Sequence, residues 1–447
     1  MGKRIGLIGE NSVEYVNALI DIWNAGNCAV LIDWRVPFQA AENMMKEAAV
    51  EACYIEKSIL EKNSFENCEI KYISFNRKSN SAELIPNEIL NKFNENFTKD
   101  EAIVLYSSGT TGKAKGIILS HFAINTNADA IIEYMQPADK DCIYIAKTLS
   151  HSSTLTGELL VGLKTRVKIV IAPTIVPPRF TLKNIEKFHA TILCLNPTLL
   201  SLYADEQKRS NHNLNSLRTI YVSGSILNDK IYETAKKTFK VTNIFNVYGL
   251  SEAGPRVSAQ TKECFKANSV GKAIEGVEIV VVDDNGKELR QGDKGIIHVK
   301  TPSVFDEYVK GNKELDSLYK GWLNTGDVGF FDENGELHIV SRVDDVIIID
   351  SHKIYPSEVE EHIIANTSIS ECVVVKLEIN GNEFIGCLYA NQCEIDKDIK
   401  DQLKSALLPY EIPRYFLRCD AIPRSTNGKI LMKEAKEYLL KELKHGN

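Results

Sequence analysis

The segment YSSGTTGKAKG, residues 106–116, brings small hydroxyl side chains, three glycines and two lysines together. Backbone N–H groups that glycine leaves accessible, together with Ser and Thr hydroxyls, can bind phosphate oxygens, which makes the segment a candidate phosphate loop. A Walker loop follows the pattern G-x-x-x-x-G-K-[ST], whereas Gly109 and Gly112 enclose only two residues here. The segment is therefore not a Walker loop, and on its own it could also be a flexible surface turn.

Further segments follow this loop in a fixed order: VSGS at 222–225, NVYGLSEAG at 246–254, NTGDVGFF at 324–331 and IPRSTNGKILMKEA at 422–435. In this order they resemble the signatures of the adenylate-forming enzymes, which include acyl- and aryl-CoA synthetases, peptide-synthetase adenylation domains and firefly luciferase. The resemblance covers essentially the whole chain. It implies that the loop binds the β- and γ-phosphates of ATP through Ser107, Ser108, Gly109, Thr110, Thr111, Gly112 and Lys115.

The segment NVYGLSEAG resembles the second signature of that family. The resemblance implies that Tyr248 stacks on adenine, Ser251 meets the α-phosphate and Glu252 holds magnesium. The residue types suit these roles: a flat ring can stack on a purine, a small hydroxyl can donate to a phosphate, and a carboxylate can bind a hard cation. Taken alone, the stretch could be a strand-end turn with an N-cap serine. The other residues that the resemblance assigns to the ATP site in these two segments are Gly224, Ser225, Asn246 and Gly249.

Asp327 matches the ribose-binding step of the family, in which an aspartate accepts hydrogen bonds from both ribose hydroxyls. Arg342, 15 residues further on, would contact ribose or phosphate, because its guanidinium group is permanently charged and carries several N–H donors. Without the resemblance, Gly-Asp in a β-rich region would be an ordinary hairpin element. Asp344 falls at the hinge position, where a small domain turns between two half-reactions. A routine linker before a helix opened by Pro356 is the alternative.

Lys429 matches the last signature, whose lysine bridges the attacking carboxylate and the α-phosphate. An ammonium on a long stem, delivered by a mobile domain, can neutralise charge that develops in the transition state. A lone Gly-Lys turn would ordinarily carry no function. The resemblance thus gives Lys429, Glu252 and Ser251 as catalytic residues, with Glu252 as the metal ligand.

His151 matches the histidine that precedes the acid-binding helix of fatty-acyl and aryl ligases. The Phe-Asp pair by which peptide-synthetase domains hold an α-amine is missing, which disfavours an ordinary amino acid as substrate. The candidate wall segments 150–157, 196–200 and 250–256 are small and mostly neutral apart from this histidine, Glu158 and Arg256. We therefore expect a medium aliphatic or aromatic acid.

Two features depart from the family pattern. Family members usually extend further before their first strand, so an acid pocket or oligomer contact contributed there is expected to differ. Ser351 stands where the family has a glycine that lines its pantetheine tunnel. A hydroxymethyl group would narrow that passage or shift the backbone, so thioester formation is less secure than adenylation. His352 is either a tunnel residue or a solvated loop histidine.

The elements that position these residues alternate between strands and helices in the first half of the chain. KRIGLIG predicts a buried strand, and SVEYVNALIDIWNAG predicts a helix closed by Gly26. The same alternation recurs up to residue 249, which indicates parallel sheets flanked by helices. After about Val270 the pattern changes to short strands joined by the hairpin turns DDNG and DENG.

The fold class is therefore expected to be α/β, with a large N-terminal domain of layered α/β sheets with a β-rich end and a small mobile α+β C-terminal domain. The boundaries expected are an AMP-binding domain over 1–341 and a small domain carrying the catalytic lysine over 342–447.

Composition limits the classes of function. The 447 residues are 44% hydrophobic and 25% charged, which is typical of a soluble enzyme. A net charge of −7 with interspersed signs argues against nucleic acid as a main ligand. No stretch is long and apolar enough to predict a membrane span. Ten cysteines without a Cys-x-x-Cys pair indicate a reducing compartment, the cytoplasm, and no zinc site.

The expected activity follows from the resemblance. Mg-ATP and a carboxylic acid would give an acyl-adenylate and pyrophosphate, and the acyl group would pass to the phosphopantetheine thiol of coenzyme A or of an acyl carrier protein. A stand-alone adenylation enzyme that serves only a carrier protein, a non-catalytic nucleotide-binding member, and a luciferase-like oxygenase are the alternatives.

Overall fold

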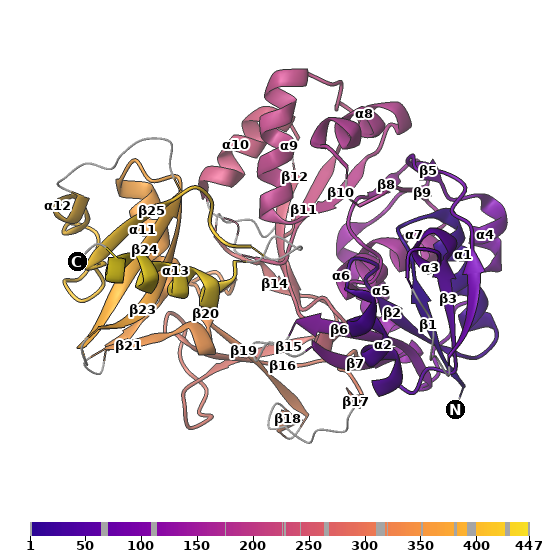
Figure 1. Ribbon diagram of the computed structural model, residues 1–447, viewed down its shortest axis with the longest axis horizontal. Coiled ribbons are helices and arrows are strands. Elements are labelled where there is room, and N and C mark those ends of the chain that lie inside the picture. Colours follow the sequence, from indigo (N-terminus) through magenta and orange to yellow (C-terminus); the bar gives the residue numbers. More distant parts are fainter. Residues whose placement is uncertain are drawn as a thin grey trace. The chain divides into compact units, whose positions relative to one another are not determined.

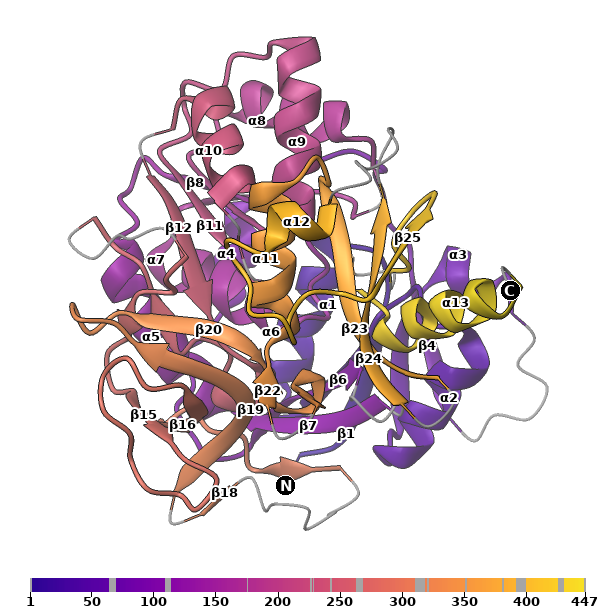
Figure 2. The same cartoon turned by 90° about the vertical axis from the view of Figure 1, so that its left-hand side faces the viewer.

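The computed structural model describes residues 2–63, 70–108, 114–174, 176–225, 227, 229–241, 243–262, 268–309, 318–319, 321–349, 352–379, 382–390, 399–424 and 430–445. The chain forms two compact units (Figures 1 and 2). Unit 1 consists of Met1–Val280, His298–Thr325 and Phe331–His338, and unit 2 of Val281–Ile297, Gly326–Phe330 and Ile339–Asn447. The expected class, a large α/β part and a small α+β part, is confirmed. The boundary after residue 341 stays a prediction.

The first sheet of unit 1 runs in the order β17-β7-β6-β2-β1-β3-β4. Its parallel strands are β1 (Arg4–Ile8), β2 (Cys28–Ile32), β3 (Ala52–Glu56), β4 (Lys71–Phe75) and β6 (Glu101–Ser108). Two antiparallel strands, β7 (Ala114–Ser120) and β17 (Glu307–Tyr308), extend one edge. β1 and β2 are buried almost throughout, as continuous apolar runs in a parallel sheet covered on both faces should be.

The helix predicted after the first strand is α1 (Val13–Asn24). The Ser12 hydroxyl caps it by accepting a hydrogen bond from the Tyr15 backbone N–H at 3.1 Å. Gly26, with φ of +71°, lies just beyond its C-terminus, in a backbone conformation that favours glycine. Three further helices precede the first hairpin: α2 (Phe38–Glu47), α3 (Lys57–Leu60) and α4 (Asn87–Lys92).

The second sheet of unit 1 runs in the order β14-β13-β12-β11-β10-β8-β9-β5. Its parallel strands are β8 (Cys142–Ile145), β9 (Lys168–Ile171), β10 (Ile192–Leu195), β11 (Thr219–Val222) and β12 (Asn243–Tyr248). Short antiparallel strands complete it: β5 (Glu83–Leu84), β13 (Ser258–Ala259) and β14 (Lys272–Ala273).

Helices cover both faces of this second sheet. On one face, α8 (Pro178–Phe188), α9 (Pro197–Ser210) and α10 (Asp229–Phe239) share a core with strand residues that include the fully buried Leu193 and Ile220 (Figure 1). On the other face, the Tyr134 ring of α5 (His121–Met135) packs edge-on against Tyr221, with 5.7 Å between centroids. The expected strand and helix alternation is confirmed here.

The β-rich part expected after Val270 forms a third sheet. Its strands run in the order β15-β16-β19-β18, with β20 beside β19. They span β15 (Glu278–Val282), β16 (Gly295–Lys300), β18 (Leu318–Tyr319), β19 (Trp322–Phe331) and β20 (Leu337–Arg342). Both predicted turns are confirmed: Asp283 N–H donates to the Lys287 carbonyl and Asp332 N–H to the Glu336 carbonyl.

In unit 2, β23 (Glu371–Ile379), β24 (Asn382–Ala390) and β25 (Tyr415–Cys419) form a sheet with an apolar core on each face. Alternate residues of β23 divide between the two cores: Cys372 and Val374 pack toward α11 (Pro356–Asn366), and Val373 and Val375 toward α13 (Met432–His445). The remaining elements are β21 (Ile347–Ile349), β22 (His352–Ile354) and α12 (Ile399–Leu403). Among the described residues, no helix combines the length and apolar composition needed to cross a bilayer.

Candidate functional site

The carboxyl ends of the parallel strands in the second sheet carry most of the site residues predicted in unit 1. His151 follows β8, Asn196 follows β10, Gly224 follows β11, and Tyr248 ends β12. In parallel α/β sheets, ligands bind outside the carboxyl ends of the strands. The fold therefore gathers residues that are far apart in the sequence along one edge.

Glu252 lies in the short 3₁₀ turn Ser251–Ala253, which follows β12. Its Oε1 atom accepts a hydrogen bond from the Tyr308 hydroxyl at 3.2 Å. The Nζ atom of Lys115 lies 5.5 Å from the centroid of the Tyr308 ring, within cation–π range. Burial, and to a smaller extent Glu252, raises the pKa of Tyr308, so its hydroxyl keeps the proton that it donates. We call Lys115, Glu252 and Tyr308 the Glu252 cluster.

Lys115 belongs to the hairpin that holds the predicted phosphate loop. β6 and β7 pair antiparallel, with Ser107 opposite Lys115 and Ser108 opposite Ala114, so the two ends of the loop are adjacent. Tyr308 reaches the same place because β17 pairs with β7, with Tyr308 opposite Ile117. The loop residues predicted to bind phosphate lie outside the described residues; they are Gly109, Thr110, Thr111 and Gly112.

The turn that carries Glu252 also contacts the segment that follows β8. The Ser251 and Ser152 hydroxyl oxygens are 2.8 Å apart. Ser152 begins α6 (Ser152–Thr154), and His151 is the residue just before this helix. The structure thus brings the serine predicted to meet the α-phosphate next to the segment predicted to bind the acid.

Two positions at this edge, Gly249 and Gly224, require glycine. A Cβ atom added to Gly249 would lie 1.8 Å from the Pro255 carbonyl oxygen, so a side chain there would displace the turn that carries Glu252. Gly224 has φ of +96°, and Ser225 beside it is exposed. Asn246 is buried, and its amide donates a hydrogen bond to the Ser269 carbonyl at 3.1 Å. Its side chain therefore connects β12 to the segment at Ser269.

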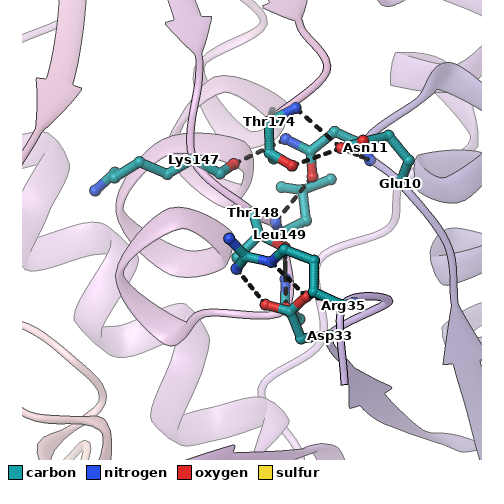
Figure 3. A network of polar contacts seen from close by, with 9 residues as sticks. Glu10, Asn11, Asp33, Arg35, Lys147, Thr148, Leu149 and Thr174 are labelled. Atoms are coloured by element: carbon teal, nitrogen blue, oxygen red, sulfur yellow. Dashed lines mark hydrogen bonds and ion pairs between the residues drawn. The ribbon is translucent and has the colours of Figure 1, made fainter. Parts of the chain in front are cut away.

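Asn11, which our sequence interpretation missed, joins the carboxyl edges of the two sheets (Figure 3). Its amide donates to the Lys147 carbonyl at 2.8 Å and to the Ala172 carbonyl at 3.2 Å. Its Oδ1 atom accepts from the Leu149 N–H at 3.0 Å. These bonds fix the backbone just before His151. A polar side chain three residues after the end of a buried parallel strand was the available signal, because such residues lie at the ligand-binding edge.

Neighbouring polar residues extend this network. Glu10 Oε1 accepts from the Thr174 hydroxyl at 2.7 Å and from its N–H at 2.9 Å. Asp33 forms an ion pair with Arg35. Burial raises the pKa of Asp33, but the hydrogen bonds and charge of Arg35, with a smaller contribution from His151, outweigh it and hold the pKa below its ordinary value. The carboxylate that faces the histidine is therefore ionised at neutral pH.

A second polar cluster is buried deeper in unit 1. The Glu158 side chain is 0% exposed, and its Oε1 lies 3.1 Å from the Nζ of Lys147. Arg256 is 2% exposed. Burial, opposed by Lys147 and Arg256, raises the pKa of Glu158 to about 7. We call the following residues the Arg256 cluster: Tyr134, Lys147, Thr154, Glu158 and Arg256.

Unit 2 holds the predicted ribose-binding pair. Asp327 is buried, and its Oδ1 accepts a hydrogen bond from Nη1 of Arg342 at 2.8 Å, so the two residues singled out by their spacing are in direct contact. Asp344 is exposed in the 3₁₀ turn Val343–Asp345, directly after β20. Lys429 and Ser351 lie outside the described residues. Within the described part of the chain, no three metal-ligating side chains form a cluster.

Comparison with known proteins shows the family of the chain. A family model described as AMP-binding enzyme matches residues 1–309. The chain is similar to 4-coumarate–CoA ligase 2 of Nicotiana tabacum, 26% identical over 96% of this chain and 83% of that one. A long-chain-fatty-acid–CoA ligase of Yersinia pestis is 27% identical over 76% of this chain and 62% of that one.

A solved structure shares the fold. It is the O-succinylbenzoate coenzyme A synthetase of Bacillus subtilis, in complex with ATP and magnesium ion. The TM-score is 0.82 at 23% identity, and the superposition covers 97% of this chain and 89% of that one. An identity this low carries the fold alone.

Proposed function

This chain belongs to the AMP-binding enzymes, and from that premise we propose that it activates a carboxylic acid with ATP and transfers the acyl group to a phosphopantetheine thiol. A carboxylate oxygen would attack the α-phosphorus of ATP. The bond between the α-phosphorus and the bridging oxygen would break, releasing pyrophosphate and leaving an acyl-adenylate. The thiolate would then attack the acyl carbon and release AMP.

The observation that carries this proposal is the Glu252 cluster and its contact with the segment at His151. Glu252 Oε1 is held by Tyr308, and Lys115 lies over the same ring at the base of the loop hairpin. Ser251, one residue earlier, contacts Ser152. A triphosphate and an acid placed here would have their reacting groups side by side, which is the geometry that a displacement at phosphorus needs.

Mg²⁺ fits the donor set. Glu252 Oε1 accepts its bond from Tyr308, and Oε2 makes no hydrogen bond with a described residue. Mg²⁺ is commonly held by one or two carboxylates together with substrate phosphates. When bound, it would neutralise charge on the phosphate oxygens. Lys115 would add a fixed positive charge at the β- and γ-phosphates, with Ser107 to Gly112 binding them through backbone N–H groups.

The remaining nucleotide contacts are proposed from the residue types. Tyr248 would stack on adenine, with Gly224, Ser225, Asn246 and Gly249 forming the pocket around it. Asp327, which Arg342 orients at 2.8 Å, would accept hydrogen bonds from the ribose hydroxyls. Lys429 would bridge the acid and the α-phosphate after a rotation at Asp344.

Coenzyme A is the acceptor that we propose first, because the relatives above are named as CoA ligases. A carrier protein is the second acceptor to assay. We also propose a reducing compartment such as the cytoplasm. The described cysteines support this, because they are buried free thiols; they are Cys28, Cys53, Cys142, Cys194, Cys372, Cys387 and Cys419.

The test is acid-dependent exchange of labelled pyrophosphate into ATP across a panel of carboxylic acids, followed by thioester formation with coenzyme A or a carrier protein. We expect exchange with at least one acid. Lys429→Ala should lower exchange by about a hundredfold or more while nucleotide binding persists. A chain that binds ATP yet exchanges pyrophosphate with no acid would be a nucleotide-binding protein and not a ligase.

A further inference from the structure

The Arg256 cluster has more positive than negative charge in the interior of unit 1. Lys147 forms an ion pair with Glu158 at 3.1 Å. Among the described residues, no carboxylate lies within ion-pair distance of Arg256. An unpaired buried cation is costly, and proteins normally give it a counter-charge. The cluster therefore lacks one anion.

The same cluster lacks hydrogen-bond partners. Within the described part of the chain, no hydrogen-bond partner is found for four of its buried atoms: Tyr134 Oη, Thr154 Oγ1, Glu158 Oε2 and Arg256 Nε. Most buried polar atoms in folded proteins have a partner, so a group of orphaned atoms in one place indicates a bound molecule or ordered water.

The position of Arg256 is fixed. Its backbone N–H donates to Asn127 Oδ1 at 2.9 Å, and its carbonyl accepts from the Asn127 amide at 2.9 Å. A Cβ atom added to Gly157 would lie 3.0 Å from Nη2 of Arg256, so the guanidinium packs directly on this glycine. The unpaired Nε–H is thus held in place and cannot escape to solvent.

Two chain segments connect the cluster to the proposed site of the reacting groups. The helical segment that begins at Ser152 beside Ser251 continues as the π-helical stretch Leu155–Leu160, which carries Glu158. Arg256 comes five residues after Ser251 on the other wall. π-Helical turns occur frequently at functional sites. An acid whose reactive carboxylate is at Ser251 would extend toward the Arg256 cluster.

We propose that the Arg256 cluster binds a second anionic group on the substrate, so that the acids activated are dicarboxylic acids or others with two negative charges. A distal carboxylate would be the missing anion, and would accept hydrogen bonds from Arg256 Nε and the Thr154 hydroxyl. The assignment rests on the proposed function and narrows the aliphatic or aromatic acid expected from the sequence. A monoacid would leave these groups unpaired, and such sites strongly reject analogues that lack the polar group.

The test compares linear dicarboxylic acids with the monomethyl ester of each, by pyrophosphate release. We expect the wild-type chain to prefer the diacid. Arg256→Leu should lower kcat/KM for the diacid by at least about thirtyfold while leaving the ester unchanged or better. Arg256→Lys should recover part of the preference. Arg209→Leu, at an exposed arginine of the same unit, is the matched control and should change neither substrate.

Two results would overturn the assignment: a wild-type preference for the ester, or an equal loss for both substrates in Arg256→Leu. If Arg256→Leu does not fold, Gly157→Ala replaces it. Its methyl group would press on the guanidinium and should raise KM for the diacid more than for the ester. An unchanged ratio of the two KM values would contradict the assignment.

Calorimetric titration of the same acids separates this assignment from the proposed function. Diacid binding that Arg256→Leu abolishes, without pyrophosphate release from any acid, would support the site and reject the ligase. Pyrophosphate release that is indifferent to Arg256→Leu would support the ligase and reject the site.

Discussion

The two polar clusters of unit 1 differ in how far their own side chains satisfy one another. In the Glu252 cluster, a tyrosine hydroxyl holds the carboxylate and a lysine lies over the tyrosine ring. In the Arg256 cluster, Glu158 and Arg256 are more deeply buried, yet both carry polar atoms without partners. The first cluster is therefore organised before a ligand arrives, whereas the second has buried polar atoms that a ligand of the proposed kind would pair.

The largest effect should come from breaking the Glu252 cluster itself. Glu252→Gln keeps the shape and removes the charge that would hold Mg²⁺, so adenylation should fall by about a hundredfold or more, as for loss of a preorganised charge-stabilising group. The loss of adenylation is measured by pyrophosphate exchange at several Mg²⁺ concentrations. Glu275→Gln, at an exposed position, is the control. A variant with wild-type exchange at every Mg²⁺ concentration would take Glu252 out of the metal site.

The Arg256 cluster should respond to pH. Below about pH 4.5, Glu158 is protonated in the folded and unfolded states alike. Between that pH and about 7, the unfolded chain loses the proton while the folded chain keeps it, because burial raises the pKa in the folded state to about 7. The free energy of unfolding therefore falls as pH rises through this window, and the loss is complete above it.

Glu158→Gln removes that dependence. Relative to wild type, the variant should gain roughly 3–4 kcal/mol of stability between pH 4 and pH 8. Urea unfolding at a series of pH values measures the difference, with Glu275→Gln as control. The charged and polar groups that face Glu158 are Lys147, Arg256 and Thr154. Parallel stability curves for variant and wild type would show that the Glu158 pKa is ordinary.

A smaller effect should follow from removing the bond that organises the Glu252 cluster. Tyr308→Phe deletes the hydroxyl that donates to Glu252 Oε1, and a hydrogen bond to a charged group at a half-buried site supports a loss of about tenfold in kcat/KM for ATP. Because the carboxylate would be less well oriented, the Mg²⁺ concentration for half-maximal rate should rise. Tyr438→Phe, at an exposed tyrosine, is the control. An unchanged Mg²⁺ requirement would make Tyr308 a packing residue only.

Much of the fold could be predicted from local patterns. A few neighbouring residues are enough to predict each of these features: the apolar strands β1 and β2, the Ser12 cap of α1, and the Asp-Asn-Gly and Glu-Asn-Gly turns. The carboxyl ends of the parallel strands β8, β11 and β12 then place the predicted His151, Gly224 and Tyr248 along one edge, because these strands belong to one sheet.

The partners of those residues were not predictable in the same way. Tyr308 reaches Glu252 from a two-residue edge strand 56 positions away, and Asn11 bonds to Leu149 across 138 positions. Such contacts arise from sheet pairing and packing, which leave no local periodicity. The polar atoms of Glu158 and Arg256 were visible in the wall segments, but only burial shows that they lack partners. The role of Lys429 stays a prediction from its motif.

The most direct measurement follows a heavy-oxygen label from the carboxylate of the activated acid. If the carboxylate attacks the α-phosphorus and the thiol later takes the acyl group, one labelled oxygen must appear in AMP, which mass spectrometry detects. If the label appears in orthophosphate, or if AMP never carries the label, the acyl-adenylate on which the proposed function depends would be contradicted.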